Sequence, residues 1–220
     1  MLPRLVIFDL DGTLVDTAPD LCAALDHALE TLGRPRVDAA TVRHLVGHGA
    51  RALLEQGLAR TGGSTPDLVE HGLPVFLAYY AAHIADASRP YDGVEAAMNA
   101  LGAAGTTLAV CTNKPVALAD ALLAALGWTA RFAAVLGGDS VAARKPDGAH
   151  VAATAAAAGH ALADAVFVGD TSVDVAAARA AGVPVIVVGF GFAPDADTLG
   201  ADRVIASYGE LDAALRELRR

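Results

Sequence analysis

The chain has 220 residues, a formal net charge of −9, a charged fraction of 19% and a mean hydropathy of +0.43. This composition excludes a disordered chain, and the acidic balance argues against a nucleic-acid partner. No apolar run reaches the roughly 18 residues of a membrane span, so we expect no membrane partner. The first residues do not resemble a secretory signal, because only a short apolar stretch separates Arg4 from Asp9. We therefore expect a cytoplasmic protein.

Short apolar runs recur along the chain, as is typical of strands buried on both faces of a parallel sheet. They lie at Leu5–Phe8, Thr107–Cys111, Ala133–Leu136, Ala165–Val168, Val183–Val188 and, more weakly, Arg203–Ala206. Between them, apolar residues three and four apart predict helices over Val94–Ala104, Val116–Leu126, Ala149–Ala158, Val173–Ala181 and Leu211–Leu218. Strands that alternate with helices predict an α/β fold with a doubly wound parallel sheet, a Rossmann-like core.

The segment from about Val15 to Ser88 breaks this alternation. It contains no run typical of a strand, and its apolar spacing predicts helices over Ala18–Leu32, Ala39–Leu45, Ala50–Arg60 and Leu68–Ile84. We therefore expect a small all-helical cap domain at residues 15–88. It would be inserted into an α/β catalytic core domain formed by residues 1–14 and 89–220.

Polar residues follow the predicted strands at the point where each strand ends. Ligands of open α/β sheets bind beyond the carboxyl ends of the strands, so these residues are expected to meet at one edge. They are Asp9-Leu10-Asp11-Gly12-Thr13, Thr112-Asn113-Lys114, Lys145-Pro146 and Gly169-Asp170, with Asp174 one helical turn further on.

This set of side chains suits phosphoryl chemistry. Four carboxylates packed together repel one another, and a hard divalent cation with oxygen ligands, Mg²⁺, resolves the repulsion. A metal, a lysine and a hydroxyl that face a carboxylate form a site for a phosphoryl group. A carboxylate can also be the nucleophile, which gives an aspartyl-phosphate.

These motifs, in this order, resemble the haloacid dehalogenase superfamily over essentially the whole chain, and the helical insertion is similar to its small helical cap. Three shorter stretches resemble the phosphoglycolate phosphatases of that superfamily: Asp16–Leu21, Val46–Arg51 and Thr112–Pro115. There are two departures. Lys145-Pro146-Asp147-Gly148 lacks the second proline expected in those enzymes, and His48 stands where they usually carry asparagine.

The resemblance implies a role for each core residue. Asp9 attacks phosphorus and is transiently phosphorylated, while Asp11 protonates the leaving alkoxide and then takes a proton from the hydrolytic water. Thr112 and Lys145 hold the phosphoryl oxygens. The Mg²⁺ site is formed by Asp9, the backbone carbonyl of Asp11, and Asp170, with Asp174 orienting a metal-bound water.

We expect the loop Gly47-His48-Gly49-Ala50-Arg51 of the cap to bind the substrate together with Asn113. Its glycines let the backbone approach the substrate closely, and its amides lie at the start of a helix, where anions bind favourably. His48 and Arg51 would pair with a substrate carboxylate. For Lys114 two alternatives stay open, namely contact with the substrate or a structural role near the start of a helix.

The resulting hypothesis is a Mg²⁺-dependent phosphomonoester hydrolase that acts on 2-phosphoglycolate, as a monomer or homodimer, with no partner beyond its small-molecule substrate. Related phosphatases or phosphomutases acting on sugar phosphates, nucleotides or pyrophosphate are the alternatives. A phospho-acceptor regulatory domain is a remote one, because such domains lack a helical insertion of this size. Phosphonoacetaldehyde hydrolases need a lysine in the cap. No lysine precedes Lys114 in this sequence, so that activity is excluded.

Overall fold

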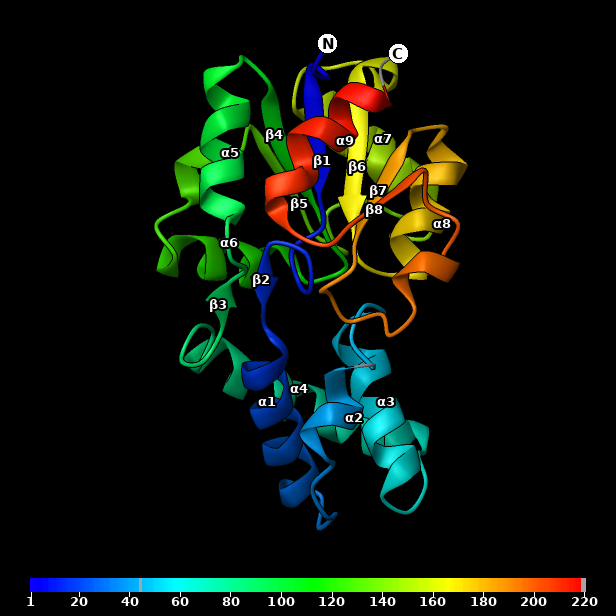
Figure 1. The fold of residues 1–220 in the computed structure, drawn as a ribbon. Helices are drawn as coiled ribbons and strands as arrows, with labels where there is room; N and C mark the ends of the chain where they lie inside the picture. Colours follow the sequence, from blue (N-terminus) through cyan, green and yellow to red (C-terminus); the bar gives the residue numbers. More distant parts are fainter. Residues whose placement is uncertain (44, 219–220) are drawn as a thin grey trace.

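The computed structural model describes residues 1–43 and 45–218. Its main sheet has six parallel strands in the order β5-β4-β1-β6-β7-β8, which confirms the predicted fold class (Figure 1). The strands are β1 (Leu5–Phe8), β4 (Thr107–Cys111), β5 (Ala134–Leu136), β6 (Ala165–Gly169), β7 (Val185–Val188) and β8 (Arg203–Ile205). Strand β7 starts two residues later than predicted, because Pro184 has no N–H to donate to a neighbouring strand.

Helices cover both faces of the sheet. They are α5 (Val94–Ala103), α6 (Val116–Ala125), α7 (Gly148–Ala157), α8 (Ser172–Ala181) and α9 (Leu211–Glu217). Every residue of β1 is fully buried, and its side chains alternate between two cores. Val6 and Phe8 pack with α5, α6 and α9, whereas Leu5 and Ile7 pack with α7 and α8. This explains why the strand is apolar at every position.

Four further helices form a separate layer beyond the carboxyl ends of the strands, at the end of the molecule opposite both termini (Figure 1). They are α1 (Ala18–Thr31), α2 (Ala39–Arg43), α3 (Ala50–Arg60) and α4 (Pro66–Ala82). Leu25, Leu54 and Phe76 are among the fully buried residues of their own hydrophobic core. We call these four helices the cap. The division of the chain into two domains at 14/15 and 88/89 stays a prediction.

Two strands that we did not predict join the cap to the core. The segment 15–88 was expected to contain no strand, but β2 (Val15–Asp16) pairs antiparallel with β3 (Arg89–Pro90). Strands of two residues are too short to show any periodicity, so the sequence pattern could not reveal them. They hold the two crossings between cap and core side by side.

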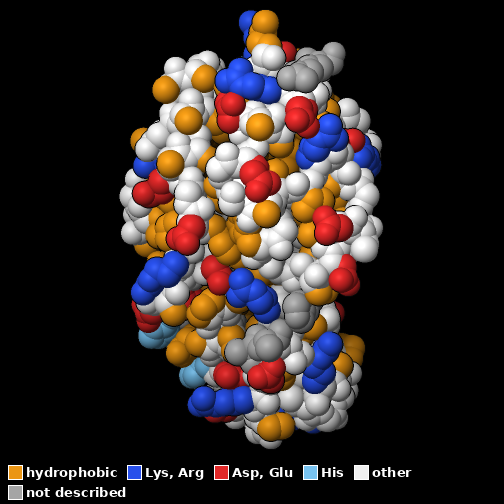
Figure 2. Space-filling model, in the orientation of Figure 1, with side chains coloured by type: hydrophobic (Ala, Val, Ile, Leu, Met, Phe, Trp, Pro, Cys, Tyr) orange, Lys and Arg blue, Asp and Glu red, His pale blue; other side chains and the backbone are white. Residues whose placement is uncertain are grey.

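Short 3₁₀ turns complete the described structure, at Thr129–Arg131, Leu162–Asp164, Ala196–Thr198 and Tyr208–Glu210. Among the helices of residues 1–43 and 45–218, none has the combination of length and apolarity that crossing a bilayer requires. Acidic and basic side chains are interspersed on the face shown in Figure 2.

Candidate active site

The site begins where β1 ends. The amide of Asp9 donates to the Val168 carbonyl at 2.9 Å, so the ladder between β1 and β6 continues up to the first acidic residue. The chain then turns at Gly12, which has a φ of +84°. A side chain there would also collide with the Asp170 carboxylate, whose Oδ2 lies 2.3 Å from the position of a Cβ. Glycine is therefore required both for the turn and for the close approach of Asp170.

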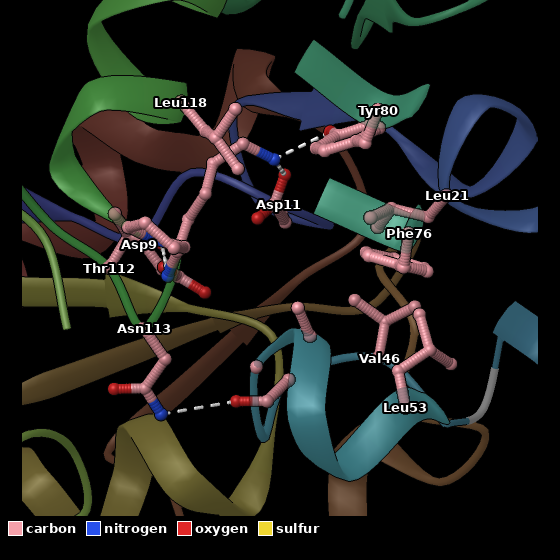
Figure 3. Close-up of a pocket in the computed structure, with 15 residues that line it drawn as sticks. Asp9, Asp11, Leu21, Val46, Leu53, Phe76, Tyr80, Thr112, Asn113 and Leu118 are labelled. Atoms are coloured by element: carbon pink, nitrogen blue, oxygen red, sulfur yellow. Dashed lines mark hydrogen bonds and ion pairs between the residues drawn. The ribbon is translucent and has the colours of Figure 1, made fainter. Parts of the chain in front are cut away.

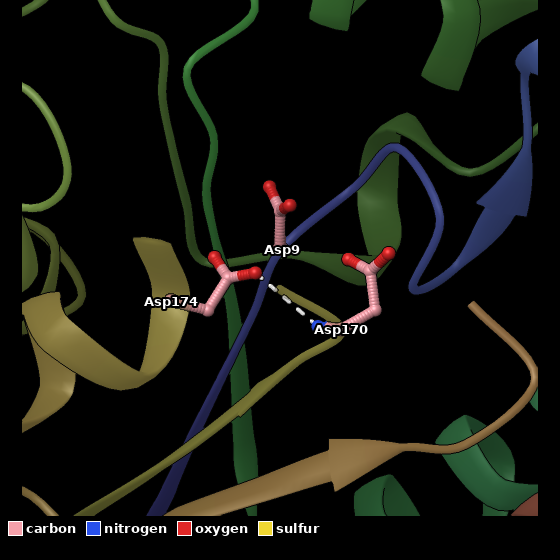
Figure 4. Close-up of side chains that lie close together, drawn as sticks. All are labelled: Asp9, Asp170 and Asp174. Carbon is pink, nitrogen blue, oxygen red and sulfur yellow. Dashed lines mark hydrogen bonds between the residues drawn. The ribbon is translucent and has the colours of Figure 1, made fainter. Parts of the chain in front are cut away.

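Three buried carboxylates meet beyond β1 and β6 (Figure 4). Asp9, Asp170 and Asp174 each offer one oxygen, and these oxygens all lie within 4.8 Å of one another. Burial, followed by the charges of Asp174 and Asp9, raises the pKa of Asp170 well above its ordinary value. The three groups therefore disfavour joint ionisation in the absence of a cation.

Two neighbouring elements orient these acids. The Asp170 carboxylate accepts hydrogen bonds from the Thr13 hydroxyl at 3.0 Å and from the Phe192 amide at 2.8 Å. Asp174 lies in the first turn of α8, where its Oδ2 accepts from the amide and the hydroxyl of Thr171. One oxygen of Asp174 thus caps the helix, while its other oxygen faces the site. The sequence motifs predict no role for Thr13, whereas the structure shows that it orients Asp170.

Lys145 joins two of these acids. Its ammonium lies 2.8 Å from Asp9 Oδ1 and 2.7 Å from Asp174 Oδ1, and the side chain is almost fully buried. Burial alone would lower the pKa of Lys145, but the charges of Asp174 and Asp9 outweigh it and raise that pKa. Burial raises the pKa of Asp9 to about 7, against the opposing charge of Lys145.

The acid cluster fits a divalent cation. Asp9 Oδ1 is buried and accepts no hydrogen bond from the described residues, although it forms an ion pair with the Lys145 ammonium. Carboxylate oxygens are the ligands that Mg²⁺ prefers, and a cation there would allow all three acids to ionise together. The set Asp9, Asp170 and Asp174 is therefore suited to hold Mg²⁺.

Two residues hold the backbone of Lys145. The Asn113 side-chain amide donates to the Lys145 carbonyl at 3.0 Å and to the Gly47 carbonyl of the cap at 3.2 Å. The Lys145 amide donates to His150 Nδ1 at 3.3 Å. His150 is fully buried on α7, and sequence reasoning missed it because nothing in its local pattern separates it from an ordinary core residue.

A second ion pair lies on the cap side of the site. The Lys114 ammonium donates to Asp11 Oδ1 at 2.8 Å and to the Tyr80 hydroxyl at 2.6 Å. The Thr17 hydroxyl donates to the same oxygen of Asp11 at 2.8 Å. The Tyr80 hydroxyl is therefore part of the site, although no sequence motif predicts a role for this residue. Burial raises the pKa of Tyr80 to about 12, so the phenol stays neutral.

A cavity lies between the core and the cap (Figure 3). Its empty space is about 480 Å³ when the open mouth is included. Its polar lining comes from Asp9, Asp11, Tyr80, Thr112, Asn113 and Lys114. Apolar side chains line the rest, among them Leu21, Val46, Leu53, Phe76 and Leu118.

The predicted cap loop is only partly at this cavity. Gly47 and Gly49 line it, and Gly49 is the N-cap residue that precedes α3, with a φ of +88°. His48 and Arg51 are exposed and do not line it, which differs from the expected contact with the substrate. The Arg51 guanidinium instead pairs with Glu70 of α4 at 2.9 Å. Both side chains are exposed, so this ion pair lies at the surface of the cap.

Comparison with known proteins decides the family. The family sequence model of the haloacid dehalogenase-like hydrolases matches residues 6–188, which include all of the acidic and basic residues of the site. The chain belongs to the haloacid dehalogenase-like hydrolase family. The resemblance and the enzyme class that the motifs predicted are thereby confirmed.

Curated relatives of this family member extend over nearly its full length. A phosphoglycolate phosphatase of Caulobacter vibrioides is 46% identical and covers 95% of this chain and 89% of its own. One of Agrobacterium fabrum is 42% identical and covers 98% and 94%. A solved structure from Lactobacillus delbrueckii, a candidate phosphoglycolate phosphatase, has a TM-score of 0.91 at 28% identity and covers 98% and 99%. CbbY of Rhodobacter sphaeroides, solved with phosphate, shares the fold with a TM-score of 0.83 at 24% identity, covering 98% and 100%.

Proposed function

We propose that this family member hydrolyses 2-phosphoglycolate to glycolate and phosphate, in a Mg²⁺-dependent reaction with an aspartyl-phosphate intermediate. The observation that carries the chemistry is the Lys145 ammonium between Asp9 and Asp174, beside a cavity that the cap covers. The choice of substrate rests on the phosphoglycolate phosphatases that are similar over most of the chain. A cytoplasmic location and a monomeric or homodimeric state stay predictions.

In the proposed first step, a carboxylate oxygen of Asp9 attacks phosphorus, and the bond from phosphorus to the ester oxygen breaks. Asp11, two residues along the same loop, gives a proton to the leaving alkoxide. Thr112 and Lys145 hold the phosphoryl oxygens while this happens. Mg²⁺, held by Asp9, the Asp11 carbonyl, Asp170 and Asp174, would supply neutralisation of the phosphoryl charge.

In the second step, water attacks the phosphorus of the aspartyl-phosphate, and the bond to the Asp9 oxygen breaks. Asp11, now ionised, takes the proton from that water, which returns both carboxyl groups to their starting state. The position of Asp11 supports this double role, because its carboxylate lines the cavity and is held by Lys114 and Thr17.

The test is phosphate release from a panel of compounds with Mg²⁺: 2-phosphoglycolate, sugar phosphates, mononucleotides and pyrophosphate. We expect the highest kcat/KM for 2-phosphoglycolate. The Asp9→Asn variant is the control for the chemistry, and it should lose at least ~10³-fold in turnover, because an amide is a poor nucleophile. Preferred turnover of another compound would reject the substrate, and near-normal activity of a correctly folded Asp9→Asn would reject the covalent mechanism.

A further inference from the structure

The cavity contains one cationic group that the proposed chemistry does not place against the substrate. Among the described residues that line it, Lys114 is the one cation, and the remaining polar groups are two carboxylates, a hydroxyl, a phenol and an amide. A carboxylate on the substrate would otherwise face acidic or apolar surface, which is costly for a charged group. Any second anionic group of the substrate therefore has Lys114 as its natural partner.

We propose that Lys114 is a specificity-determining residue that binds the carboxylate of the substrate, and that Tyr80 of the cap positions its ammonium. This inference rests on the proposed function, since it assumes a small phosphomonoester with a carboxylate near its phosphate. It assigns one lysine to each end of the substrate, with Lys145 at the phosphoryl group and Lys114 at the carboxylate.

The position of Lys114 supports this assignment. Its ammonium contacts Asp11, while that of Lys145 contacts Asp9, and two residues of extended chain span at most about 7 Å. The two cations thus lie beside acids that are a short distance apart along one loop. Such a placement suits a small molecule with an anionic group at each end.

Lys114 also has the capacity to bind a further anion. An ammonium group carries three N–H donors, and the described structure assigns two of them, to Asp11 and to Tyr80. The ammonium therefore keeps one N–H donor for the substrate. The substrate carboxylate would then share this cation with Asp11.

Tyr80 fixes the place of the ammonium. The phenol is fully buried at the end of α4, its hydroxyl accepts from Lys114, and the Lys114 ammonium lies 4.3 Å from the centre of its ring. In Figure 3 the hydroxyl of Tyr80 and a carboxylate oxygen of Asp11 approach the same nitrogen, which is the Lys114 ammonium. The cap thereby contributes to specificity through a residue that does not need to touch the substrate.

Other cations near the cavity are less well placed. Lys145 is engaged by Asp9 and Asp174, and Arg51 pairs with Glu70 on the surface. Arg144 is exposed near the mouth, where its Nη1 lies 3.4 Å from the position that a Cβ on Gly49 would take. Arg144 does not line the cavity, which makes it a matched control for the loss of one positive charge close to the site.

The test compares two substrates that differ in the carboxylate alone, 2-phosphoglycolate and ethyl phosphate. The variants are Lys114→Met, which keeps the aliphatic stem, and Arg144→Ala. In Lys114→Met the ratio of the two kcat/KM values should fall by roughly 10–150-fold, the value of a charge-assisted pair. Any loss that acts through Asp11 affects both substrates and cancels in this ratio. Arg144→Ala should change the ratio by less than about 2-fold.

Two further measurements keep the proposal testable if Lys114→Met folds poorly. Tyr80→Phe retains the ring and removes one hydrogen bond, so the same ratio should fall by roughly 2–10-fold. Calorimetry then compares the affinity of Asp9→Asn with that of the Asp9→Asn, Tyr80→Phe double variant. The double variant should bind 2-phosphoglycolate more weakly, whereas its affinity for inorganic phosphate should be unchanged.

Each result has a distinct meaning. An equal loss on both substrates in Lys114→Met, or an unchanged ratio in Tyr80→Phe, would overturn the inference and leave Lys114 as a positioning residue for Asp11. A wild-type enzyme that prefers another phosphomonoester in the panel would instead reject the proposed substrate. An unchanged preference for 2-phosphoglycolate in Lys114→Met would reject the inference alone.

Discussion

At the scale of single residues, the chain uses its two lysines differently from its 14 arginines. Both lysines are buried in the site, each against a carboxylate, whereas arginines such as Arg179 and Arg203 form ion pairs at the surface. An ammonium is a compact point charge with three donors, and it can bridge two acids in a space too small for a guanidinium. A buried ion pair of this kind is costly to form, so its presence points to a functional rather than a stabilising role.

The role proposed for Asp11 predicts a contrast between leaving groups. Asp11→Asn should lose about 10²–10⁴-fold in turnover of alkyl phosphates, because the alkoxide then leaves without a proton. The loss should be smaller for p-nitrophenyl phosphate, whose leaving group needs little protonation. Initial rates on the two substrates measure the contrast, and equal losses would show that Asp11 is not the general acid.

His150 predicts a pH dependence of stability. Burial, aided by the charge of Lys145, lowers the pKa of His150 to about 4, whereas the ordinary value of 6.5 applies to the unfolded chain. Between these pH values the unfolded chain binds a proton that the folded chain does not, so the free energy of unfolding rises with pH. We expect the free energy of unfolding to fall by up to ~3 kcal/mol through His150 as the pH falls from 7 to about 4.

The measurement is urea unfolding of wild type and His150→Asn across this range. The asparagine can accept from the Lys145 amide as His150 Nδ1 does, but it does not titrate. The difference in unfolding free energy between the two proteins should therefore shift in favour of the variant as the pH falls. The exposed His71→Asn is the control, and a pH-independent difference for His150→Asn would contradict the prediction.

At the scale of elements, the site depends on how strand ends and helix starts are held. Strands β1, β4 and β6 are each followed directly by a residue of the site, and Thr171 and Asp174 form a capping box at the start of α8. At the other boundary, Asp20 in the first turn of α1 is buried and accepts from the amides of Ala87 and Ser88. It also accepts from the Ser88 hydroxyl at 2.6 Å. One side chain thus ties the first crossing between cap and core to the second.

Removal of this tie should lower stability. Asp20→Ala leaves the Ala87 and Ser88 amides without their acceptor, at an expected cost of ~2–4 kcal/mol. For a chain of this size the melting temperature should fall by roughly 5–10 °C. Calorimetry measures the change, with the exposed Asp120→Ala as the control, expected to stay within about 0.5 kcal/mol of wild type. A drop no larger than that of Asp120→Ala would mean that the tie contributes nothing.

At the scale of the whole molecule, the site exists because cap and core meet. The core contributes Asp9, Asp11 and Lys114 to the cavity, and the cap contributes Tyr80, Leu53 and Phe76. The Asn113 amide bonds to Gly47 across this boundary. The cap covers the acids with apolar side chains, which excludes water and strengthens every charge interaction below it.

The acid cluster predicts that metal binding stabilises the fold as well as supporting turnover. EDTA should abolish phosphate release, Mg²⁺ should restore it, and Ca²⁺, which prefers more ligands at longer distances, should inhibit. Mg²⁺ at 100 times its dissociation constant should add about 2.7 kcal/mol of stability, or roughly 5–10 °C in melting temperature. Asp170→Asn should lose this thermal shift. Full turnover in metal-free buffer would contradict the cluster as a metal site.

Local sequence patterns were sufficient to predict most helices and strands and the motifs of the core domain. The run Leu5–Phe8 followed by Asp9 identifies a buried strand and the start of the site, since burial and polarity change within one residue. Parallel strands bring their carboxyl ends to one edge, so the convergence of Asp9, Lys145 and Asp170 follows from the order of elements. Helix positions in the cap were also predictable, because each helix buries one apolar face.

The partners of the remaining side chains depend on packing between segments that are far apart in the chain. Lys114 meets Tyr80 across 34 residues, which is a contact between core and cap, and Asp11 across 103, which is a contact within the core. Arg51 had the right charge and a suitable loop, yet the packing of α3 against α4 gives it Glu70. Local sequence specifies which face of a helix is apolar, whereas the partner of each charge is set only when the helices dock.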